Sequence, residues 1–408
     1  MLQKDFKPVL RFMVVSDVHY KDEHCVEEER MEKAIKIAYR LAEGHDTYKR
    51  LDAVFADGDF ANSGTETQMR KFKATLDNNL KPETKYMLNM ASHEYHGNGV
   101  EAAYKLFGEV FNIPVDNHIE INGFHFITMS SSHGCEYEQD KVEFARNELK
   151  KAREADPKKP IFFFQHPHLT DTVSGSIYWA DESFIPTLMD YPQVIDFSGH
   201  SHVPINDPRS IHQRHFTCLG TGSLSYFELD EFDKHYGTVP PNKADCAQML
   251  IVEADENGAV RIYPYDVLTD NFFPFVWEID EPWNVESFKY TDARYKTTDA
   301  PWFEDDADVT VSDITDKGFN VTFPQAKVKT EYVNDYKVVI KEAENGLTVK
   351  QKKIWSDYYF YNMPETLSVN FDDLKPDTEY EVSVIAGSFW DTYSEPIKTT
   401  VKTPLKEE

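Results

Sequence analysis

The sequence contains few residues that would cross-link the chain or draw it to a polyanion or a membrane. Its 408 residues include only four cysteines, Cys25, Cys135, Cys218 and Cys246. They are widely spaced without a Cys-x-x-Cys pair, so we expect free thiols. Basic residues number 43 against 71 acidic ones, a net charge of -28. This charge argues against binding to nucleic acid polymers, and no apolar run is long enough to suggest membrane insertion.

Motifs of several common enzyme classes are also missing. The chain has no Gly-x-x-x-x-Gly-Lys-Ser/Thr loop for nucleoside triphosphates, no Gly-x-Ser-x-Gly elbow of a serine hydrolase, and no Gly-x-Gly-x-x-Gly after a predicted strand. The first residues show no signal-peptide pattern. We therefore expect a cytoplasmic protein by default, and a secreted or cell-surface protein if a signal segment has been removed.

What the sequence does contain, from residue 9 to about residue 200, is an alternation of short apolar runs and amphipathic stretches. The apolar runs predict strands at residues 9–16, 53–56, 85–90, 161–164 and 194–198. Apolar residues at steps of three and four predict helices over residues 31–42, 69–80 and 138–155. A hairpin is predicted at residues 120–124, around an Asn-Gly turn. The pattern indicates an α/β fold with helices packed against a mixed sheet.

The helical pattern ends after residue 202. Residues 215–228 and 249–267 are predicted strands, which we expect to complete a second sheet. Residues 270–300 are rich in Pro, Trp and acidic side chains without periodicity, as in a packed connector. We therefore divide the chain into an N-terminal domain, a connector and a C-terminal domain, at residues 1–268, 269–304 and 305–408.

Short strands and turns alone are predicted in the C-terminal domain, which is typical of an all-β sandwich. The segment Leu374-Lys-Pro-Asp-Thr-Glu-Tyr380 resembles the fibronectin type III signature, and Phe323 stands where that family usually has Trp. The resemblance implies that the Tyr380 hydroxyl folds back onto the main chain as a tyrosine corner. It also leaves open a contact with a protein or a glycan through this domain.

Five polar clusters each follow a predicted strand of the N-terminal domain. They are Asp17-Val-His19, Gly58-Asp59-Phe-Ala-Asn62, Ser92-His93-Glu94, His166, and Gly199-His200-Ser-His202. Ligand crevices of open α/β sheets lie beyond the carboxyl ends of the strands, so these residues can converge. Imidazole and carboxylate together suit transition metals such as Mn, Fe or Zn better than Mg or Ca.

The order of the five clusters resembles the calcineurin-like metallophosphoesterase family over about residues 10–205. That resemblance implies a four-layer α/β/β/α sandwich and two divalent or trivalent ions of Mn, Fe or Zn. Asp17, His19 and His202 would hold the first ion, and Asp59 would bridge. His166 and His200 would hold the second ion.

The same resemblance implies hydrolysis of a small phosphate ester by a hydroxide held between the two ions. His93 would assist the leaving group, and Asn62 would orient its ring. The family has an Asn ligand of the second ion where this chain has Ser92. Ser92 would supply a hydroxyl or hold a water there, a weaker arrangement for that ion.

Four readings of the function follow. A phosphodiester is the expected substrate, because the Asp-x-His motif and lone His166 resemble the cyclic-nucleotide phosphodiesterase branch. The alternatives are a phosphomonoesterase, or a degenerate member that binds a ligand without turnover. A reading centred on the C-terminal domain is the weakest. His168, Tyr95 and His96 are interpreted as structural or solvated rather than as catalytic.

Overall fold

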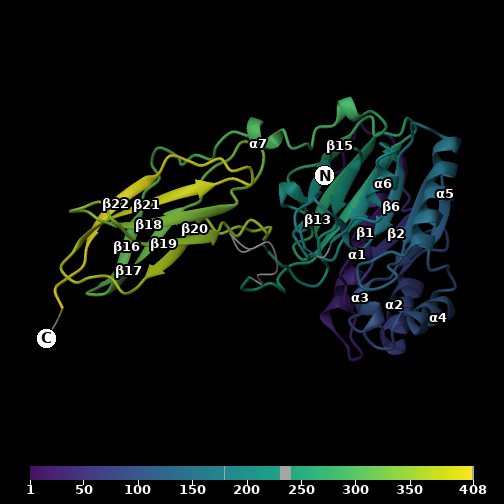
Figure 1. Ribbon diagram of the computed structural model, residues 1–408, viewed down its shortest axis with the longest axis horizontal. Coiled ribbons are helices and arrows are strands. Elements are labelled where there is room, and N and C mark those ends of the chain that lie inside the picture. Colours follow the sequence, from purple (N-terminus) through teal and green to yellow (C-terminus); the bar gives the residue numbers. More distant parts are fainter. Residues whose placement is uncertain (179, 230–239, 407–408) are drawn as a thin grey trace. The chain divides into compact units, whose positions relative to one another are not determined.

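The computed structural model describes residues 1–178, 180–229 and 240–406; residues 179, 230–239 and 407–408 lie outside the description. The described chain forms two compact units, Met1–Thr291 and Asp292–Glu408 (Figure 1). The division between them falls within the predicted connector, residues 269–304. Part of that connector is ordered as strand, because residues 271–272 and 277–279 pair with the strand at residues 260–266. We describe each unit by itself.

The first sheet of the N-terminal unit has seven strands in the order β14-β13-β12-β1-β2-β3, with β15 also on β13. Its strands are β1 (Pro8–Val15), β2 (Ala53–Asp57), β3 (Lys85–Asn89), β12 (Gln248–Asp255), β13 (Val260–Asp266), β14 (Asn271–Phe272) and β15 (Trp277–Ile279). β1, β2 and β3 are parallel, and β12 is antiparallel to β1. The prediction that residues 249–267 complete a second sheet was therefore wrong. Their register against residues 8–14 is a long-range pairing that the local sequence pattern does not encode.

The second sheet has six strands in the order β10-β11-β9-β6-β5-β4. They are β4 (Asn117–Ile121), β5 (Phe124–Met129), β6 (Ile161–Gln165), β9 (Val194–Ser198), β10 (Ile211–Gln213) and β11 (Thr217–Gly220). Asn122 and Gly123 form the predicted hairpin turn between β4 and β5, both with positive φ angles as an Asn-Gly turn requires. β5, β6, β9 and β11 are mutually parallel.

Helices cover the outer face of each sheet. The longer ones are α1 (Val26–Glu43), α2 (Glu66–Asn79), α4 (Val100–Phe111) and α5 (Gln139–Ala155). The short ones are α3 (Ser92–Tyr95), α6 (Ile185–Leu188), η1 (Pro208–Ser210) and η2 (Val285–Ser287). Buried side chains of α1, α2 and α4 share a core with the first sheet, and those of α5 and α6 share one with the second. A minor two-stranded sheet pairs β7 (His168–Leu169) with β8 (Ala180–Asp181).

An aromatic cluster joins the two sheets face to face. Phe12 of β1 lies 5.3 Å from Phe55 of β2 in its own sheet, and 4.9 Å from Phe162 and 5.2 Å from Phe126 in the other, between ring centroids. Phe55 stacks on Phe164 of β6 at 4.3 Å. These contacts complete four layers, α/β/β/α, and confirm the predicted fold class. Rigid packing between the sheets fixes where their carboxyl ends lie relative to one another.

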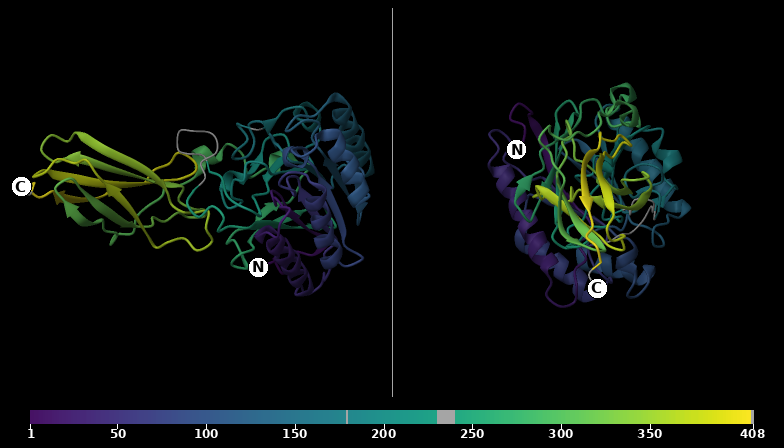
Figure 2. Two further views of the ribbon diagram at one scale, coloured as in Figure 1. Left: turned by 90° about the horizontal axis from the view of Figure 1, so that it is seen from below. Right: turned by 90° about the vertical axis from the view of Figure 1, so that its left-hand side faces the viewer.

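The C-terminal unit begins with a short helix, α7 (Arg294–Thr297), and continues as an all-β sandwich (Figure 2). Its predicted fold class is also confirmed. Three strands form one sheet and four form the other: β16 (Thr310–Thr315), β17 (Gly318–Pro324) and β20 (Thr366–Phe371); β18 (Asp335–Glu342), β19 (Thr348–Trp355), β21 (Glu379–Gly387) and β22 (Ile397–Lys402). The Tyr380 hydroxyl accepts from the Lys375 amide at 2.8 Å, so the predicted tyrosine corner is present. Phe323 packs 5.0 Å from Tyr336 in the core.

Helix length and composition also bear on the membrane prediction. Among the described residues, every helix is too short or too polar to cross a lipid bilayer.

Candidate metal centre

Four of the five polar clusters begin where a parallel strand ends. β1 ends at Val15, β2 at Asp57, β6 at Gln165 and β9 at Ser198, and the expected ligands follow within a few residues. Five of these ligands have positive φ angles of 49° to 69°: Asp17, His19, Asp59, His200 and His202. Non-glycine residues are uncommon in this region and pay for it in conformational energy, of order 1 kcal/mol or more each. Such strain gathered at one place indicates a functional site.

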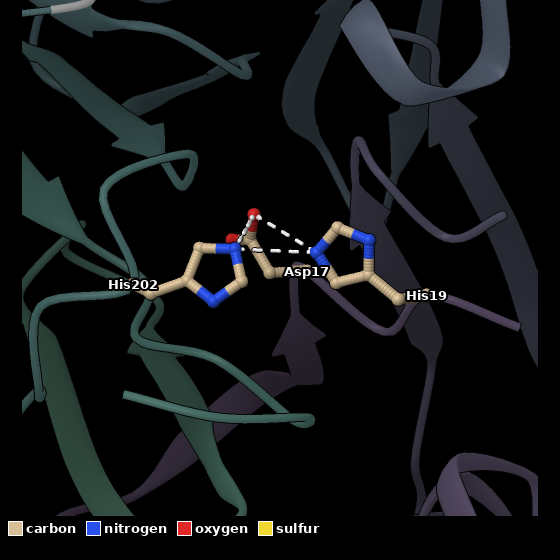
Figure 3. Close-up of side chains that lie close together, drawn as sticks. All are labelled: Asp17, His19 and His202. Atoms are coloured by element: carbon tan, nitrogen blue, oxygen red, sulfur yellow. Dashed lines mark hydrogen bonds and ion pairs between the residues drawn. The ribbon is translucent and has the colours of Figure 1, made fainter. Parts of the chain in front are cut away.

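The first cluster joins the end of β1 to the loop after β9. The Nε2 atoms of His19 and His202 lie 3.2 Å apart. Asp17 Oδ1 lies 3.2 Å from His202 Nε2 and 4.0 Å from His19 Nε2. All three side chains are buried and point toward one another (Figure 3).

The second cluster consists of Asp59, His166 and His200, whose ligand atoms also lie close enough together for one ion. His166 Nε2 is 3.0 Å from Asp59 Oδ2 and 3.5 Å from Asp17 Oδ1. His166 therefore touches a carboxylate of each cluster. A third group, His19 with Asp59 and His93, overlaps both clusters.

The donor atoms fit bound transition metals. Ligands about 2.0–2.2 Å from one ion lie roughly 3 to 3.5 Å apart along the edges of its coordination shell, close to the spacings seen here. Asp17 Oδ1, His19 Nδ1 and His166 Nε2 are buried without a hydrogen-bond partner. Buried polar atoms are rarely left so, and two of these three face the neighbouring ligands at those spacings.

Hydrogen bonds from main-chain groups and from Ser16 hold the rings and carboxylates. His166 Nδ1 lies 2.6 Å from the Asp57 carbonyl oxygen, and His202 Nδ1 lies 2.9 Å from that of Tyr226. A carbonyl can only accept, so each Nδ1 carries the proton and each Nε2 faces the site. Asp17 Oδ2 accepts from Ser16 Oγ at 2.7 Å and from the His200 amide at 3.1 Å. This is the second layer that metal-binding histidines and carboxylates require.

The electrostatics of the centre balance carboxylates against imidazoles. Burial works against ionisation of Asp17 and Asp59, yet the neighbouring imidazoles, His202 and His166 respectively foremost, hold both pKa values below their usual range. Burial works against protonation of His166 too, but Asp59 and Asp17 raise its pKa well above the ordinary value. For His19, burial and His202 lower the pKa to about 3. A cation between the two carboxylates is electrostatically favourable.

His93 lies beside the centre. Its Nδ1 is 2.8 Å from the main-chain oxygen of Asn62, and its amide donates to Asp59 Oδ1 at 3.0 Å. Asn62 thus touches the His93 ring through its main-chain oxygen, while its side chain donates to Ser63 Oγ at 3.2 Å. That Asn62 orients this ring stays a prediction. Ser92, the first residue of α3, is half-buried and stands next to His93.

Sequence reasoning missed the role of Glu94. This fully buried carboxylate accepts from the amides of Asp59 at 3.1 Å, Ala61 at 2.8 Å and Ala91 at 3.0 Å, and so ties the loop after β2 to the loop after β3. Burial first, and then Asp59, raises its pKa to about 8. The available signal was its place directly after His93.

Two glycines are needed by the packing of the centre. A Cβ on Gly58, whose φ is +76°, would lie 2.4 Å from the His166 ring. A Cβ on Gly199 would lie 2.6 Å from Asp17 Oδ2. Each glycine lets one loop approach a ligand from another strand.

The three residues interpreted as non-catalytic differ in what their side chains contact. The Tyr95 hydroxyl donates to the Met90 and Ser131 carbonyls, at 3.2 Å and 2.7 Å, as a packing residue would. The His96 ring lies 4.6 Å from the His93 ring. His168 is buried and hydrogen-bonded at both ring nitrogens.

Comparison with known families decides the class. The model of the calcineurin-like phosphoesterase family matches residues 10–204, and that of the fibronectin type III domain matches residues 299–400. The N-terminal unit belongs to the calcineurin-like phosphoesterase family. It is thus a metal-dependent phosphoester hydrolase, and the Asp and His clusters of the calcineurin-like unit are where metal can bind.

Solved structures resemble the chain only distantly. Purple acid phosphatase PPD1 from yellow lupin (Lupinus luteus) is 13% identical over 66% of this chain and 53% of its own, with a TM-score of 0.47. The fn3 domain of human collagen alpha-1(XX) chain is 14% identical over 28% of this chain and 92% of its own, with a TM-score of 0.21. The chain spans about half the length of the lupin protein. A search of curated proteins found no match.

Proposed function

We propose that the calcineurin-like unit hydrolyses a phosphodiester with two metal ions. The observation that carries the proposal is the contact between the two clusters. His166 Nε2 lies within 3.5 Å of carboxylate oxygens of both Asp17 and Asp59, so the clusters are adjacent sites rather than separate ones. Adjacent ions can act on one phosphoryl group.

Asp17, His19 and His202 would hold one ion, and Asp59, His166 and His200 the other. Bound there, the ions would supply an activated water and neutralise charge on the phosphoryl oxygens. The chain's own part is to fix the ligands. The Asp57 and Tyr226 carbonyls orient His166 and His202, and Glu94 holds the loop that carries Asp59.

His93 is placed to serve the leaving group. Its Nδ1 proton is donated to the Asn62 carbonyl, so Nε2 is the ring nitrogen available for proton transfer. The ring centroid lies 4.5 Å from that of His19. A protonated Nε2 would donate to the departing oxygen and so lower the barrier to bond cleavage.

The choice of a diester rests on the sequence around the motifs. A monoester dianion carries one more negative charge than a diester and profits from extra cations in the site. Residues 60–69 and 94–104, which follow the second and third motifs, contain neither Arg nor Lys. The first motif and the lone His166 also resemble the phosphodiesterase branch.

The test is a pair of substrates and a metal count. Purified protein loaded with Mn²⁺ should carry two ions and hydrolyse bis-p-nitrophenyl phosphate faster than p-nitrophenyl phosphate. The reverse order of rates would reassign the protein as a phosphomonoesterase. Two bound ions without turnover of either ester would contradict the enzyme proposal.

A degenerate, ligand-binding member is the second candidate, favoured by Ser92 at the position of the family's amide ligand. It requires that the second cluster binds its ion too weakly for turnover. Ser92→Asn separates the two candidates. If this variant gains an ion and activity that the natural protein lacks, the natural chain is the degenerate member.

A further inference from the structure

His168 is a buried histidine just outside the ligand set, and it makes two short hydrogen bonds. It follows His166 by two residues, at the start of β7, and is 2% exposed. Its Nδ1 lies 2.8 Å from Ser198 Oγ and its Nε2 lies 2.6 Å from Ser201 Oγ. It therefore links the segment that follows β6 to Ser198 and Ser201, the residues immediately before and after Gly199 and His200.

The following arrangement of protons gives every group in this network a hydrogen-bond partner. The Ser198 hydroxyl donates to the Leu219 carbonyl at 3.3 Å, so Ser198 Oγ accepts from His168 Nδ1. His168 Nε2 then accepts from the Ser201 hydroxyl. Ser201 Oγ in turn accepts from the Val203 amide at 3.3 Å. Each group in the chain of bonds has its partner.

Ser201 lies in the sequence between His200 and His202, which are expected ligands of different clusters. Both neighbours have positive φ angles, 69° and 54°, so this loop needs support from its surroundings. Gly175 closes on Ser201 from another side, since a Cβ there would lie 2.5 Å from Ser201 Cβ. Ser201 is thus held by His168 and by close packing.

We propose that His168 is a positioning residue for both metal clusters, acting through Ser201 to fix His200 and His202. This inference rests on the two-ion function proposed above. Pro167 joins His166 to His168, and its ring restricts the main chain between them. One short segment therefore provides a ligand of the second cluster and supports the loop that carries ligands of both.

The test measures Mn²⁺ binding by full-length variants. The method is calorimetric titration with the metal alone. His168→Ala and Ser201→Ala should each weaken Mn²⁺ binding about 10- to 100-fold, the usual effect of losing an outer hydrogen-bond partner of a metal site. His118→Ala is the matched control. It removes a histidine of β4 that also makes two hydrogen bonds, to Glu148 and His125, and it should leave the affinity unchanged.

Rescue separates positioning from general stability. In His168→Gln the longer amide can accept from Ser201, whereas the shorter amide of His168→Asn can replace only the bond to Ser198. We expect Gln to restore Mn²⁺ affinity and Asn to leave it weak, even at equal thermal stability. Ser201→Ala keeps the inference testable if His168→Ala does not fold.

The outcomes are distinguishable from failure of the proposed function. Natural protein that binds fewer than two Mn²⁺ ions would overturn the two-ion proposal and this inference with it. Natural protein with two ions, and unchanged affinity in both His168→Ala and Ser201→Ala, would overturn the role of His168 alone. Equal rescue by Asn and Gln would also overturn it.

Discussion

The two units use the same backbone conformation for different purposes. In the calcineurin-like unit, five expected ligands with positive φ angles converge at the carboxyl ends of parallel strands. In the fibronectin type III unit, five aspartates with positive φ angles, Asp313, Asp357, Asp373, Asp377 and Asp391, stand in strand irregularities and surface turns. Left-handed residues mark a site only where their side chains are buried and meet.

Buried polar atoms separate the units in the same way. Among the described residues, those that lack a hydrogen-bond partner all belong to the calcineurin-like unit, and Asp17, His19 and His166 of the metal centre are among them. The described polar interior of the fibronectin type III unit is satisfied, as the tyrosine corner illustrates. At the metal centre, Asp17 Oδ1 and His166 Nε2 lie where a bound ion would satisfy them.

The largest expected effect comes from substituting Asp59 in the calcineurin-like unit, with an aspartate of the other unit as the control. Asp59→Ala should lower kcat/KM by at least about 1000-fold, because this carboxylate belongs to two of the three candidate metal groups. Asp377→Ala removes a left-handed aspartate from the other unit and should leave activity intact. Steady-state kinetics with bis-p-nitrophenyl phosphate measures both, and an active Asp59→Ala protein would refute the site.

Two glycines with similar positive φ angles test the packing around His166, because alanine should strain the main chain to a similar extent at both. Gly58 and Gly346 have φ angles of +76° and +71°, but a Cβ on Gly58 strikes the His166 ring, whereas one on Gly346 meets nothing within 4 Å. Gly58→Ala should reduce activity on the order of 100-fold by displacing a ligand. Gly346→Ala should cost only about 1 kcal/mol of stability in its unit. Equal loss of activity in the two variants would contradict the packing argument.

Metal removal should act on one unit alone. A ligand at 100 times its Kd stabilises the unit that binds it by about 2.7 kcal/mol. Chelation with EDTA should therefore lower the Tm of the calcineurin-like unit by roughly 5 to 10 °C, and leave the other transition in place. Differential scanning calorimetry with and without Mn²⁺ shows both. A shift of both transitions by the same amount would break the contrast.

The smallest expected effect lies in the tyrosine corner. Tyr380→Phe removes the acceptor of the Lys375 amide and should destabilise the fibronectin type III unit by about 1–2 kcal/mol without changing activity. Tyr393→Phe, at a residue 57% exposed, is the matched control and should have almost no effect. Urea unfolding of the two variants gives the comparison. Equal unfolding midpoints would show that the tyrosine corner does not stabilise the unit.

The sequence predicted the architecture best where the pattern is local. All five strands predicted between residues 9 and 198 are present, because short apolar runs bounded by polar residues code for buried strands. α4 was missed, although Ala103, Phe107 and Val110 are spaced as on a helix. The pairing of β12 with β1 was also missed, because strand partners far apart in sequence leave no local signal.

The candidate site shows a similar limit. The motifs identified residues that lie close together in the structure. This was predictable because the carboxyl ends of parallel strands meet at one edge of a sheet. They did not reveal that Asn62 contacts His93 through its main chain, or that Glu94 gathers three amides. Such contacts depend on loop conformation, which residue type alone does not determine.

The carbonyl partners of His166 and His202 have a consequence for how this protein can change over evolution. The acceptors at positions 57 and 226 are peptide oxygens. The main-chain conformation therefore determines which nitrogen of each imidazole carries the proton. Side chains at those two positions can drift without erasing the acceptors. A substitution at either position therefore leaves this part of the metal centre in place, whereas a loop insertion that bends the main chain there would disturb it.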